Sequence, residues 1–580
     1  MKPHCLLFSS LFFGIAGVFA DALSYDYTAI TECLEEPLEP QYNGGIIVNP
    51  EINEGLRGWT THGGVKIESR SSHKGNKFLV AHSRKHTYAS MSQKLFLETD
   101  KHYTFSAWIQ VTGKGNAVVS AIFKTSQGFK PAGLVIARAG CWSMLKGGLS
   151  VDFAGGPVEL YFQSKNTSID IWIDSVSLQP FTNEEWRSHQ DQSIEKVRKS
   201  EVRLQVLDAE GKPLRNTNIS IAQSNAGFPI GVAINQNILR NNAYQSWFLS
   251  KKFTVTTFEN EMKWYSTERS RGVEDYSVPD SMLAFASQHG IKVRGHNIFW
   301  EDPRFQPNWI TNLSPADLKA ATNKRLNSIV PRYKGKVIAW DVDNENMHFN
   351  FFTSKLGAGI SASFYQSTHQ LDGQTTLFLN EYNTIEDSRD GAVSPSKYLE
   401  KVGEIRRALG AGANIAIGVE GHFSSANIAY MRSALDTLAS AKIPIWITEL
   451  DVSSGPNQAS YLGQILREAR SHPAIQGIVI WAAWSPQGCY RMCLTDNNFN
   501  NLPTGDVVDK LLSEGGVGQA FEAMTDNDGF FNASLFHGDY QIKFLQQPTT
   551  LAEEQHSSSF VSRSFRVDNH VSEQVIRISA

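Results

Sequence analysis

The sequence predicts a multidomain protein in which an N-terminal β-sandwich precedes a (β/α)8 TIM barrel, with a small accessory β domain built from the segments that flank the barrel. Three observations lead to this prediction. The 580 residues are too many for one ordinary domain. Residues 43–182 have the texture of short antiparallel strands, whereas residues 228–512 alternate strand-like runs with helical patterns.

The sandwich prediction depends on β-branched and aromatic runs that glycine-rich turns separate. The segments 103–111, 118–124 and 169–176 alternate or run apolar, and turns such as 112–115 lie between them. Many short strands with turn signals at this spacing are typical of a β-sandwich.

The barrel prediction depends on a count of strand–helix units. Eight short apolar runs begin near Pro229, Thr254, Lys292, Val337, Thr375, Asn414, Pro444 and Gly477. Ser314, Pro315 and Asp317 supply a cap, a first-turn proline and an acidic third position for one intervening helix. A doubly wound open sheet would not need eight units, and no G-x-G-x-x-G loop follows the first run. The pattern therefore favours a closed (β/α)8 barrel over 228–512.

The segments on either side of the barrel return to β texture. Residues 183–227 begin as a polar linker or short helix at 183–201 and continue with strand-like pieces at 202–214 and 219–221, and 513–580 is similar. Neither segment holds enough strands for an independent core. We therefore expect them to pair across the ends of the barrel as one small β sandwich.

The charge and the N-terminal targeting signal limit the binding partners and the cellular location that the sequence allows. The formal net charge is −4 with both signs dispersed, which gives no basic face for a nucleic acid. Lys2 precedes a short apolar run that ends in small residues at Ala20 and Ala22, as in a cleaved signal peptide over 1–20. A membrane anchor is the alternative, but the run is shorter than the roughly 20 apolar residues that a span needs. We expect a secreted chain that is monomeric and free of the membrane.

Four cysteines remain after the signal peptide: Cys33, Cys141, Cys489 and Cys493. They permit three disulfide pairings, and the last two could close a small loop. A metal site is the alternative, but no Cys/His cluster lies nearby to complete four ligands, so we expect neither a metal nor a cofactor. Sequons for N-glycosylation occur at Asn166, Asn218, Asn312 and Asn532.

Polar and aromatic residues recur at the C-terminal ends of seven consecutive barrel strands, where barrel enzymes build their active sites. These ends are the segments 259–264, 294–300, 340–345, 380–383, 420–422, 448–451 and 481–484. A barrel with a purely structural role would not need this recurrence. The sequence therefore predicts an active site at this end of the barrel.

Two glutamates at these strand ends carry the predicted chemistry. Glycoside hydrolysis needs one carboxylic acid that protonates the leaving oxygen and one carboxylate opposite the anomeric carbon. Glu345 and Glu449 end the fourth and seventh strands, and we assign them these two roles. Asn344 can bond the sugar 2-hydroxyl, a contact that strengthens in the transition state. Glu381 and Asp451 fit a structural or a supporting role equally well.

Histidines and tryptophans complete the predicted cleft. His296 and His422 are suited to holding the carboxylates and the ring hydroxyls. Flat faces on which sugar rings could stack are offered by Trp264, Trp300, Trp481 and Trp484.

The strand-end motifs resemble those of family 10 glycoside hydrolases. The sequence W-D-V-D-N-E at 340–345 is similar to that family's acid/base motif, and I-T-E-L-D at 447–451 resembles its nucleophile motif. The segments 259–264, 294–300 and 420–422 also match in order, so the resemblance covers about 225–512. It implies a retaining endo-1,4-β-xylanase that needs no metal and acts on xylan, arabinoxylan or glucuronoxylan.

The resemblance also implies a set of substrate-binding residues. Glycone subsites are expected at Glu259, Asn260, Lys263, His296 and Trp300, while Asn344 meets the 2-hydroxyl and His422 contacts the nucleophile. The full set assigned to substrate binding is Glu259, Asn260, Lys263, Trp264, His296, Trp300, Asn344, Glu420, His422, Trp481 and Trp484.

The N-terminal segment has a weaker resemblance of its own. Residues 43–182 are similar to family 22 carbohydrate-binding modules, which bind xylan. Together with the segment 484–496, this module looks like the plant cell-wall branch of family 10 and implies the cell wall or apoplast as the location.

Several positions depart from the family patterns. Asp343 stands where valine is usual, and its side chain should point toward the helices rather than the cleft. Glu301 stands where histidine is common, Glu420 where glutamine is frequent, and the eighth strand lacks the usual W-G-v-x-D sequence. In the sandwich, Tyr88 and Gln163 stand where tryptophan and glutamate would bind sugar more strongly.

Three alternatives remain open at the level of the sequence. A catalytically weak xylan-binding wall protein would keep the cleft but release no sugar. A cellulase or mixed-linkage glucanase would use the same barrel on another polymer. Transglycosylation would follow if a sugar replaced water at the intermediate.

Overall fold

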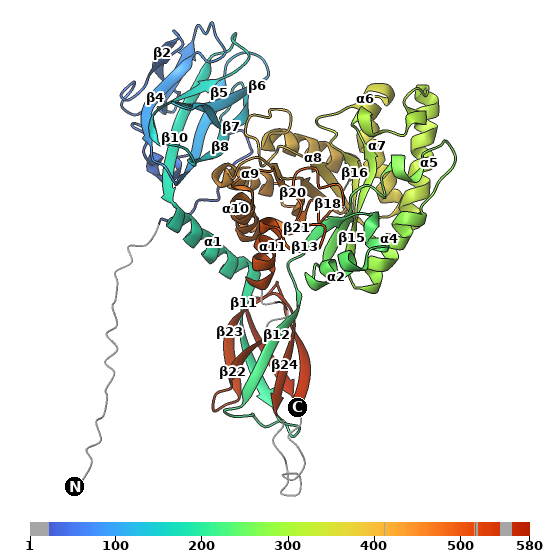
Figure 1. Ribbon diagram of the computed structural model, residues 1–580. Helices are drawn as coiled ribbons and strands as arrows, with labels where there is room; N and C mark the ends of the chain where they lie inside the picture. The colour runs from blue at the N-terminus through green and yellow to red at the C-terminus, as the bar shows by residue number, and fades with distance from the viewer. Residues whose placement is uncertain (1–22, 411, 515–516, 518–519, 546–559) are drawn as a thin grey trace, which may run out of the picture.

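The computed structural model describes residues 23–410, 412–514, 517, 520–545 and 560–580. An N-terminal sandwich, a barrel and a smaller β domain follow one another, so the predicted fold class is confirmed (Figure 1). The signal peptide predicted at 1–20 lies outside the described residues. Among the residues described, no helix combines the length and apolar character that crossing a bilayer requires.

Two antiparallel sheets form the sandwich. One has the order β1-β4-β9-β6-β7 and the other β2-β3-β10-β5-β8. The first sheet comprises β1 (Thr60–His62), β4 (Ser90–Leu97), β9 (Gly156–Gln163), β6 (Asn116–Thr125) and β7 (Gly128–Arg138). The second comprises β2 (Lys66–Ser71), β3 (Lys77–His82), β10 (Ile171–Thr182), β5 (Lys101–Val111) and β8 (Ser143–Ser150). Inward-facing residues such as Phe105, Phe123 and Leu160 are buried between the sheets and form one core.

Eight parallel strands close the barrel within the described residues. They are β13 (Ile230–Ile234), β14 (Val255–Phe258), β15 (Lys292–Trp300), β16 (Ala339–Asn344), β17 (Thr376–Glu381), β18 (Ile415–Val419), β20 (Ile445–Val452) and β21 (Ile475–Ile480). Closure is visible because β13 pairs with both β14 and β21. A two-residue strand, β19 (His422–Phe423), extends the pairing beside β20. Each of the eight predicted runs has therefore become one barrel strand.

Helices cover the outside of the barrel. The longer ones are α2 (Asn242–Ser250), α4 (Ser277–Gln288), α5 (Pro315–Tyr333), α7 (Ile360–Leu371), α8 (Pro395–Leu409), α9 (Ile428–Ala439), α10 (Gln458–Ser471) and α11 (Pro503–Glu514), and the short ones are α3 (Trp264–Thr267) and α6 (Phe351–Leu356). The predicted start of α5 is confirmed, since the Ser314 hydroxyl accepts from the Asp317 N–H at 3.2 Å.

The flanking segments form the expected accessory domain. Helix α1 (Asn183–Arg198) leads into β11 (Lys199–Leu207), which pairs with β23 (Phe530–Phe536) and β26 (Glu573–Ser579). Strand β12 (Asn218–Ala226) pairs with β22 (Ala520–Met524) and β24 (Gly538–Leu545), and β24 pairs with β25 (Phe560–Val567). Residues from both segments share one core. The two ends of the barrel segment are thereby joined, as the sequence predicted.

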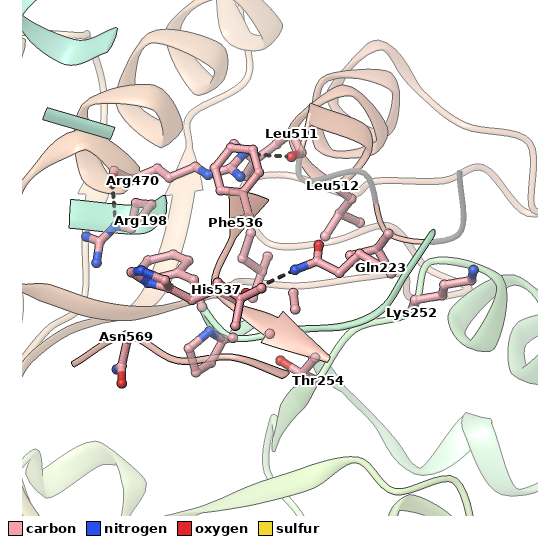
Figure 2. A pocket seen from close by; sticks show the side chains of 18 of the residues that line it. Arg198, Gln223, Lys252, Thr254, Arg470, Leu511, Leu512, Phe536, His537 and Asn569 are labelled. Atoms are coloured by element: carbon pink, nitrogen blue, oxygen red, sulfur yellow. Dashed lines mark hydrogen bonds between the residues drawn. The ribbon is translucent and has the colours of Figure 1, made fainter. Parts of the chain in front are cut away.

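A cavity of about 870 Å³ lies where the accessory domain meets the start of the barrel strands (Figure 2). The Arg198 guanidinium fills part of this junction and donates to the carbonyls of Arg470, His472 and Ile475 at 2.7–2.8 Å. Arg470 in turn donates to the Leu511 carbonyl at 3.0 Å. Because barrel chemistry occurs at the opposite, C-terminal strand ends, we interpret this cavity as a structural junction.

The four described cysteines form two disulfides: Cys33–Cys141 joins the segment before the sandwich to the sandwich, and Cys489–Cys493 lies after the eighth barrel strand. The sequence allowed three pairings of these cysteines. The observed one includes the Cys489–Cys493 bond, which closes the small loop that the sequence suggested. The sequons predicted at Asn166, Asn218, Asn312 and Asn532 all lie at exposed positions.

Candidate active site

The two predicted catalytic glutamates lie at the same end of the barrel. Glu345 follows β16 directly, and its N–H donates to the Asn380 carbonyl of β17 at 3.1 Å. Its backbone has φ 55°, a left-handed conformation that costs energy in a non-glycine residue and occurs often at functional sites. Glu449 lies inside β20 and is 6% exposed. The strand ends therefore fix both backbones before any side-chain contact is considered.

Three polar groups surround the Glu449 carboxylate. His296 Nε2 lies 3.8 Å from one oxygen, His422 Nε2 lies 3.6 Å from the other, and Asn380 Nδ2 donates at 3.0 Å. Burial alone would raise the pKa of Glu449, but the charge of His296 and the hydrogen bond from His422 outweigh it and lower this pKa to about 2. Glu449 is therefore held as a carboxylate at neutral pH.

Glu345 has the opposite electrostatic environment. Burial and the nearby charge of Glu381 together raise its pKa to about 8. Glu381 is itself buried and accepts from the Met347 N–H at 2.9 Å and from His348 Nδ1 at 2.5 Å. Glu345 therefore keeps its proton at neutral pH, as a general acid requires.

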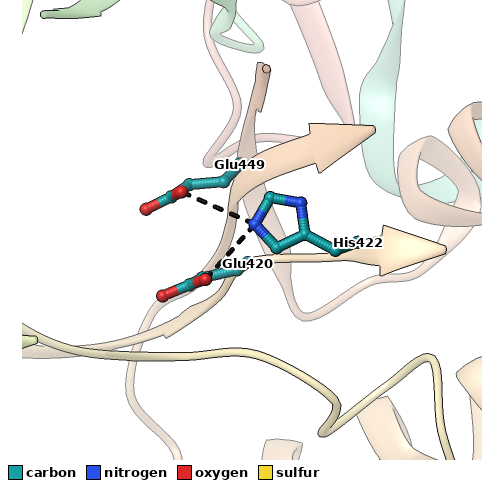
Figure 3. A group of neighbouring side chains, drawn as sticks. All are labelled: Glu420, His422 and Glu449. Atoms are coloured by element: carbon teal, nitrogen blue, oxygen red, sulfur yellow. Dashed lines mark ion pairs between the residues drawn. The ribbon is translucent and has the colours of Figure 1, made fainter. Parts of the chain in front are cut away.

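His422 lies between two carboxyl groups (Figure 3). Its Nε2 is 3.3 Å from Glu420 and 3.6 Å from Glu449, and its Nδ1 is 3.0 Å from Asp451. These acidic neighbours outweigh burial and raise the pKa of His422, so the ring carries a positive charge. Burial and the charge of Glu449 raise the pKa of Glu420. A neutral Glu420 resembles the glutamine that often stands at this position. The positive charge of His422 compensates the negative charge of Glu449. Glu420, His422 and Glu449 also lie close enough together to hold a cation.

A buried chain of ion pairs orients His296. Its Nδ1 contacts Asp341 at 2.7 Å, and Asp341 also accepts from Arg294 at 2.6 Å. This leaves Nε2 facing Glu449. The His296 ring is 2% exposed, so its Nε2 contacts the Glu449 carboxylate and is shielded from solvent.

Asn380 is a site residue that the sequence analysis did not select. Its Nδ2 lies 2.9–3.0 Å from oxygens of Asn344, Glu420 and Glu449. An amide has only two N–H groups, so two of these contacts form at a time. The Asn344 side-chain oxygen can accept from Asn380, while its NH2 group donates to Glu345 at 3.4 Å and has a second N–H for a substrate hydroxyl. The sequence feature that could have identified Asn380 is its position at the end of the fifth strand.

Lys263 and two tryptophans form one wall of the cleft. The Lys263 ammonium lies 4.4 Å from the Trp300 ring centre and 5.9 Å from that of Trp481, and it donates to Asn260 at 3.2 Å. Glu259 accepts from Asn235 at 3.1 Å, and burial raises the pKa of Glu259 to about 7. Both tryptophans are partly exposed, and one face of Trp300 is stacked on Phe305 with the ring centres 4.3 Å apart.

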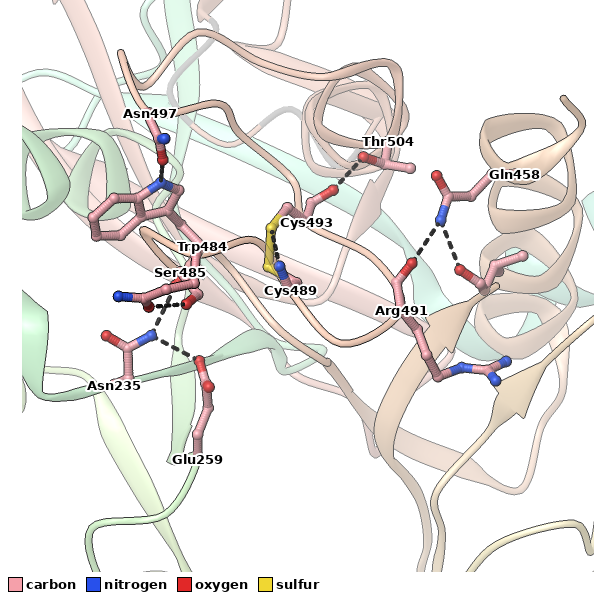
Figure 4. The surroundings of a disulfide bond; sticks show 12 residues. Asn235, Glu259, Gln458, Trp484, Ser485, Cys489, Arg491, Cys493, Asn497 and Thr504 are labelled. Carbon is pink, nitrogen blue, oxygen red and sulfur yellow. Dashed lines mark hydrogen bonds between the residues drawn. A yellow bond between two sulfur atoms is a disulfide. The ribbon is translucent and has the colours of Figure 1, made fainter. Parts of the chain in front are cut away.

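Trp264 and Trp484 are exceptions to the predicted set of sugar platforms. They are only 4% and 5% exposed and belong to the barrel core. The Trp264 indole donates to Glu268 at 2.9 Å, and the Trp484 indole donates to Asn497 at 2.8 Å (Figure 4). Neither ring has a free face, so the prediction that they stack on sugar is wrong. Their apolar bulk completes the core beneath the cleft instead.

The unusual carboxylate Asp343 lies behind the cleft, as predicted. Its side chain is fully buried on the helix side and accepts from Asn346 Nδ2 at 3.2 Å, which also contacts Ser361 of α7 at 2.9 Å. Glu301 accepts from the Phe352 N–H at 2.6 Å at the start of α6. Burial and the charge of Asp343 raise the pKa of Glu301 to about 8.

The barrel mouth therefore combines a protonated carboxylic acid, Glu345, an ionised carboxylate, Glu449, and the amide of Asn344 beside the acid. This combination defines a hydrolase that cleaves glycosidic bonds with a carboxyl pair.

The comparisons agree with this class. Residues 218–504 match Glycosyl hydrolase family 10, and residues 44–167 match a Carbohydrate binding domain. Endo-1,4-beta-xylanase 5-like of Arabidopsis thaliana is 40% identical over 549 residues, which cover 93% of this chain and 92% of that protein. Endo-1,4-beta-xylanase 5 of the same plant is 44% identical over 462 residues and 78% and 80% of the two chains. The chain belongs to glycosyl hydrolase family 10, and its N-terminal sandwich is a carbohydrate-binding domain.

Solved structures were matched as well. Xylanase 10B from Thermotoga petrophila, solved in complex with xylobiose, has a TM-score of 0.44 at 23% identity and covers 50% of this chain and 94% of its own. The assignment of the sandwich to family 22 of the carbohydrate-binding modules stays a prediction.

Proposed function

We propose that this protein is an endo-1,4-β-xylanase that hydrolyses internal bonds of cell-wall xylan with retention of configuration. The opposed protonation of Glu345 and Glu449 carries this proposal, because a double displacement needs an acid and a nucleophile in one cleft. Family membership and the names of the Arabidopsis relatives support xylan as the substrate.

In the first step, Glu345 protonates the leaving glycosidic oxygen while a Glu449 oxygen attacks the anomeric carbon. The bond to the leaving sugar breaks, and an ester links the remaining sugar to Glu449. In the second step, Glu345 takes a proton from a water molecule, and this proton restores the acid. The water oxygen attacks the anomeric carbon and displaces the Glu449 carboxylate. Asn344 donates to the sugar 2-hydroxyl throughout, positioned by Asn380.

Cleavage inside a chain is supported by cavities at two separate parts of the barrel mouth, one beside the end of β14 and one beside the ends of β17 and β18. A cavity of about 500 Å³ is lined by Glu259 and Asn260, and another of about 290 Å³ is lined by Asn383 and His422. We place the glycone part of the chain on the Lys263, Trp300 and Trp481 side. A polymer could then pass through the cleft without presenting an end.

The test compares variants on soluble glucuronoxylan and arabinoxylan. Glu449→Gln keeps the shape of the carboxylate but removes the nucleophile, so kcat should fall by about 10³-fold or more. Proton NMR of fresh products should show the β anomer first. Full xylan cleavage by Glu449→Gln, or initial release of the α anomer, would contradict the proposal.

The remaining alternatives give different products. A xylan-binding wall protein would release no reducing sugar, and a glucanase would prefer cellulose or mixed-linkage glucan. Transglycosylation would appear as oligosaccharides longer than the xylo-oligosaccharide supplied. We keep it as an accompanying activity because the same glycosyl–enzyme intermediate serves both outcomes.

We also propose that the mature chain is secreted to the cell wall as a glycosylated monomer. The two disulfides and the four exposed sequons support an oxidising, glycosylating route. Expression in plant cells, with mass analysis of the culture medium before and after deglycosylation, tests this. Retention of the chain inside the cell with residue 1 intact would contradict it.

A further inference from the structure

We propose that a single xylan chain occupies the catalytic cleft and the carbohydrate-binding domain at the same time, with its aglycone part in the groove between them. This inference rests on the proposed function and adds a composite binding site to it. The alternative is that the carbohydrate-binding domain holds a separate chain and only brings the enzyme to its polymer.

Two adjoining cavities define the groove. One, of about 290 Å³, begins at Asn383 and at His422, whose Nε2 lies 3.6 Å from the Glu449 carboxylate. The other, of about 660 Å³, is lined by Tyr88 and Gln163 of the carbohydrate-binding domain. Both are also lined by Phe129, Pro131, Ser388 and Arg389, so they meet at these four residues.

One barrel loop, residues 382–394, joins the catalytic site to this meeting point. At its inner end Glu386 accepts from the His422 N–H at 3.1 Å. Asp390 accepts from His348 at 2.9 Å, and His348 is the partner of Glu381 beside the acid. At its outer end the Ser388 hydroxyl donates to the Pro131 carbonyl of β7 at 2.9 Å.

The two domains are held together tightly enough to keep such a groove in register. Lys146 of β8 forms a buried ion pair with Asp436 of α9 at 2.8 Å, and both side chains are at most 3% exposed. Gly148 lies against the same helix, where a Cβ atom would come within 2.5 Å of the Ala429 backbone. A buried ion pair and a contact that admits only glycine indicate a fixed interface.

The lining has the chemistry of a sugar site. Phe129 is 64% exposed and Tyr88 is 42% exposed, so both rings offer open aromatic surface to the groove. Ser120 and Gln163 supply hydroxyl and amide groups in the same cavity. Aromatic faces with a few polar groups match the apolar face and the hydroxyls of a pyranose ring.

The strand order indicates which part of the bound xylan lies in the groove. The Lys263 and Trp300 wall belongs to β14 and β15, whereas Asn383 and His422 follow β17 and β18 across the barrel. If the glycone lies on the Lys263 side, the groove receives the aglycone. The leaving part of the substrate would therefore be the part that touches the carbohydrate-binding domain.

The test uses the full chain with Phe129→Ala, Phe129→Tyr and the control Phe96→Ala, because Phe96 is 60% exposed in the same domain but lies outside both cavities. For each variant, kcat/KM is measured on long soluble glucuronoxylan and on p-nitrophenyl β-xylobioside, whose aglycone is too small to reach the groove. The ratio of the two values should fall about threefold to tenfold in Phe129→Ala, mainly through KM. It should stay at the wild-type level in Phe129→Tyr and Phe96→Ala.

A ratio unchanged in Phe129→Ala would overturn the composite site while leaving the proposed function intact. Weaker retention of Phe129→Ala on insoluble xylan, with unchanged cleavage of soluble chains, would also overturn it, because that is the behaviour of a domain that holds a separate chain. A wild-type protein that cleaves neither substrate would overturn the proposed function itself.

Discussion

Arg491 donates to the Asp451 carboxylate at 2.6 Å, and this contact connects a surface disulfide to the nucleophile. Arg491 lies between Cys489 and Cys493, and Asp451 lies 3.0 Å from His422 Nδ1. The opposite nitrogen of His422 faces Glu449. The loop after the eighth strand, which departs from the family pattern, therefore supports the charge state of the catalytic carboxylate.

We predict that Arg491→Lys lowers kcat about tenfold with little change in KM. Lysine keeps the charge but cannot donate to Asp451 and to the Phe423 carbonyl in one fixed geometry. With Asp451 displaced, the pKa of His422 should fall and that of Glu449 should rise. The acidic limb of the kcat/KM profile should then move to higher pH.

Arg566→Lys is the control, because Arg566 forms a comparable but exposed ion pair in the accessory domain. A uniform loss of activity at every pH in Arg491→Lys would contradict the positioning role and indicate a folding defect.

A second prediction concerns the alkaline limit of activity. Glu345 must be protonated to act, and the charge of Glu381 helps to hold its pKa near 8. In Glu381→Gln this negative charge is removed, so the pKa of Glu345 should fall. The alkaline limb should move to lower pH, with kcat/KM at pH 8 reduced about threefold to tenfold. Glu210→Gln, a change at an exposed position, should leave the profile unchanged. An alkaline limb that stays in place would show that Glu381 does not set this pKa.

A third prediction separates the two roles of Glu345. Glu345→Gln cannot protonate a leaving group, so cleavage of unactivated xylan should fall about 10³-fold or more. A dinitrophenyl xylobioside needs no acid for its departure, so its first step should be nearly unaffected. The second step still lacks its base, so a burst of dinitrophenol followed by slow turnover is expected in stopped-flow measurements. Equal losses on both substrates, without a burst, would contradict the assignment.

The fold and the catalytic pair could be predicted from the sequence because each has a local signature. Strand runs alternate with helical patterns, and the Ser314 cap can be read from neighbouring residues. The strand ends place Glu345 and Glu449 at one end of any barrel with this order. The local sequence determines which residues lie at the end of a strand, and this placement does not depend on what their side chains contact.

Burial of single side chains was harder to predict. Trp264 and Trp484 stand at strand ends, yet their rings turn into the core toward Glu268 and Asn497. Asn380 looked no different from other polar residues, because its importance comes from three oxygens that lie in or directly after three other strands. Long-range contacts of this kind depend on side-chain direction, and a single sequence does not record it.

The last prediction concerns Asp343, whose buried carboxyl has a pKa raised to about 6 by burial. An aspartate in the unfolded chain has a pKa of about 3.9. Because the folded state binds its proton more tightly, this group destabilises the fold progressively as pH rises from about 4 through 6. Asp343→Asn removes that charge while keeping the side-chain shape, so it should stabilise the barrel by about 1–3 kcal/mol at pH 8 and by little at pH 4. Thermal unfolding of both proteins at the two pH values measures this difference, with the exposed Asp528→Asn as control. A stabilisation that is equal at both pH values would mean that packing, rather than the buried charge, sets the effect of Asp343.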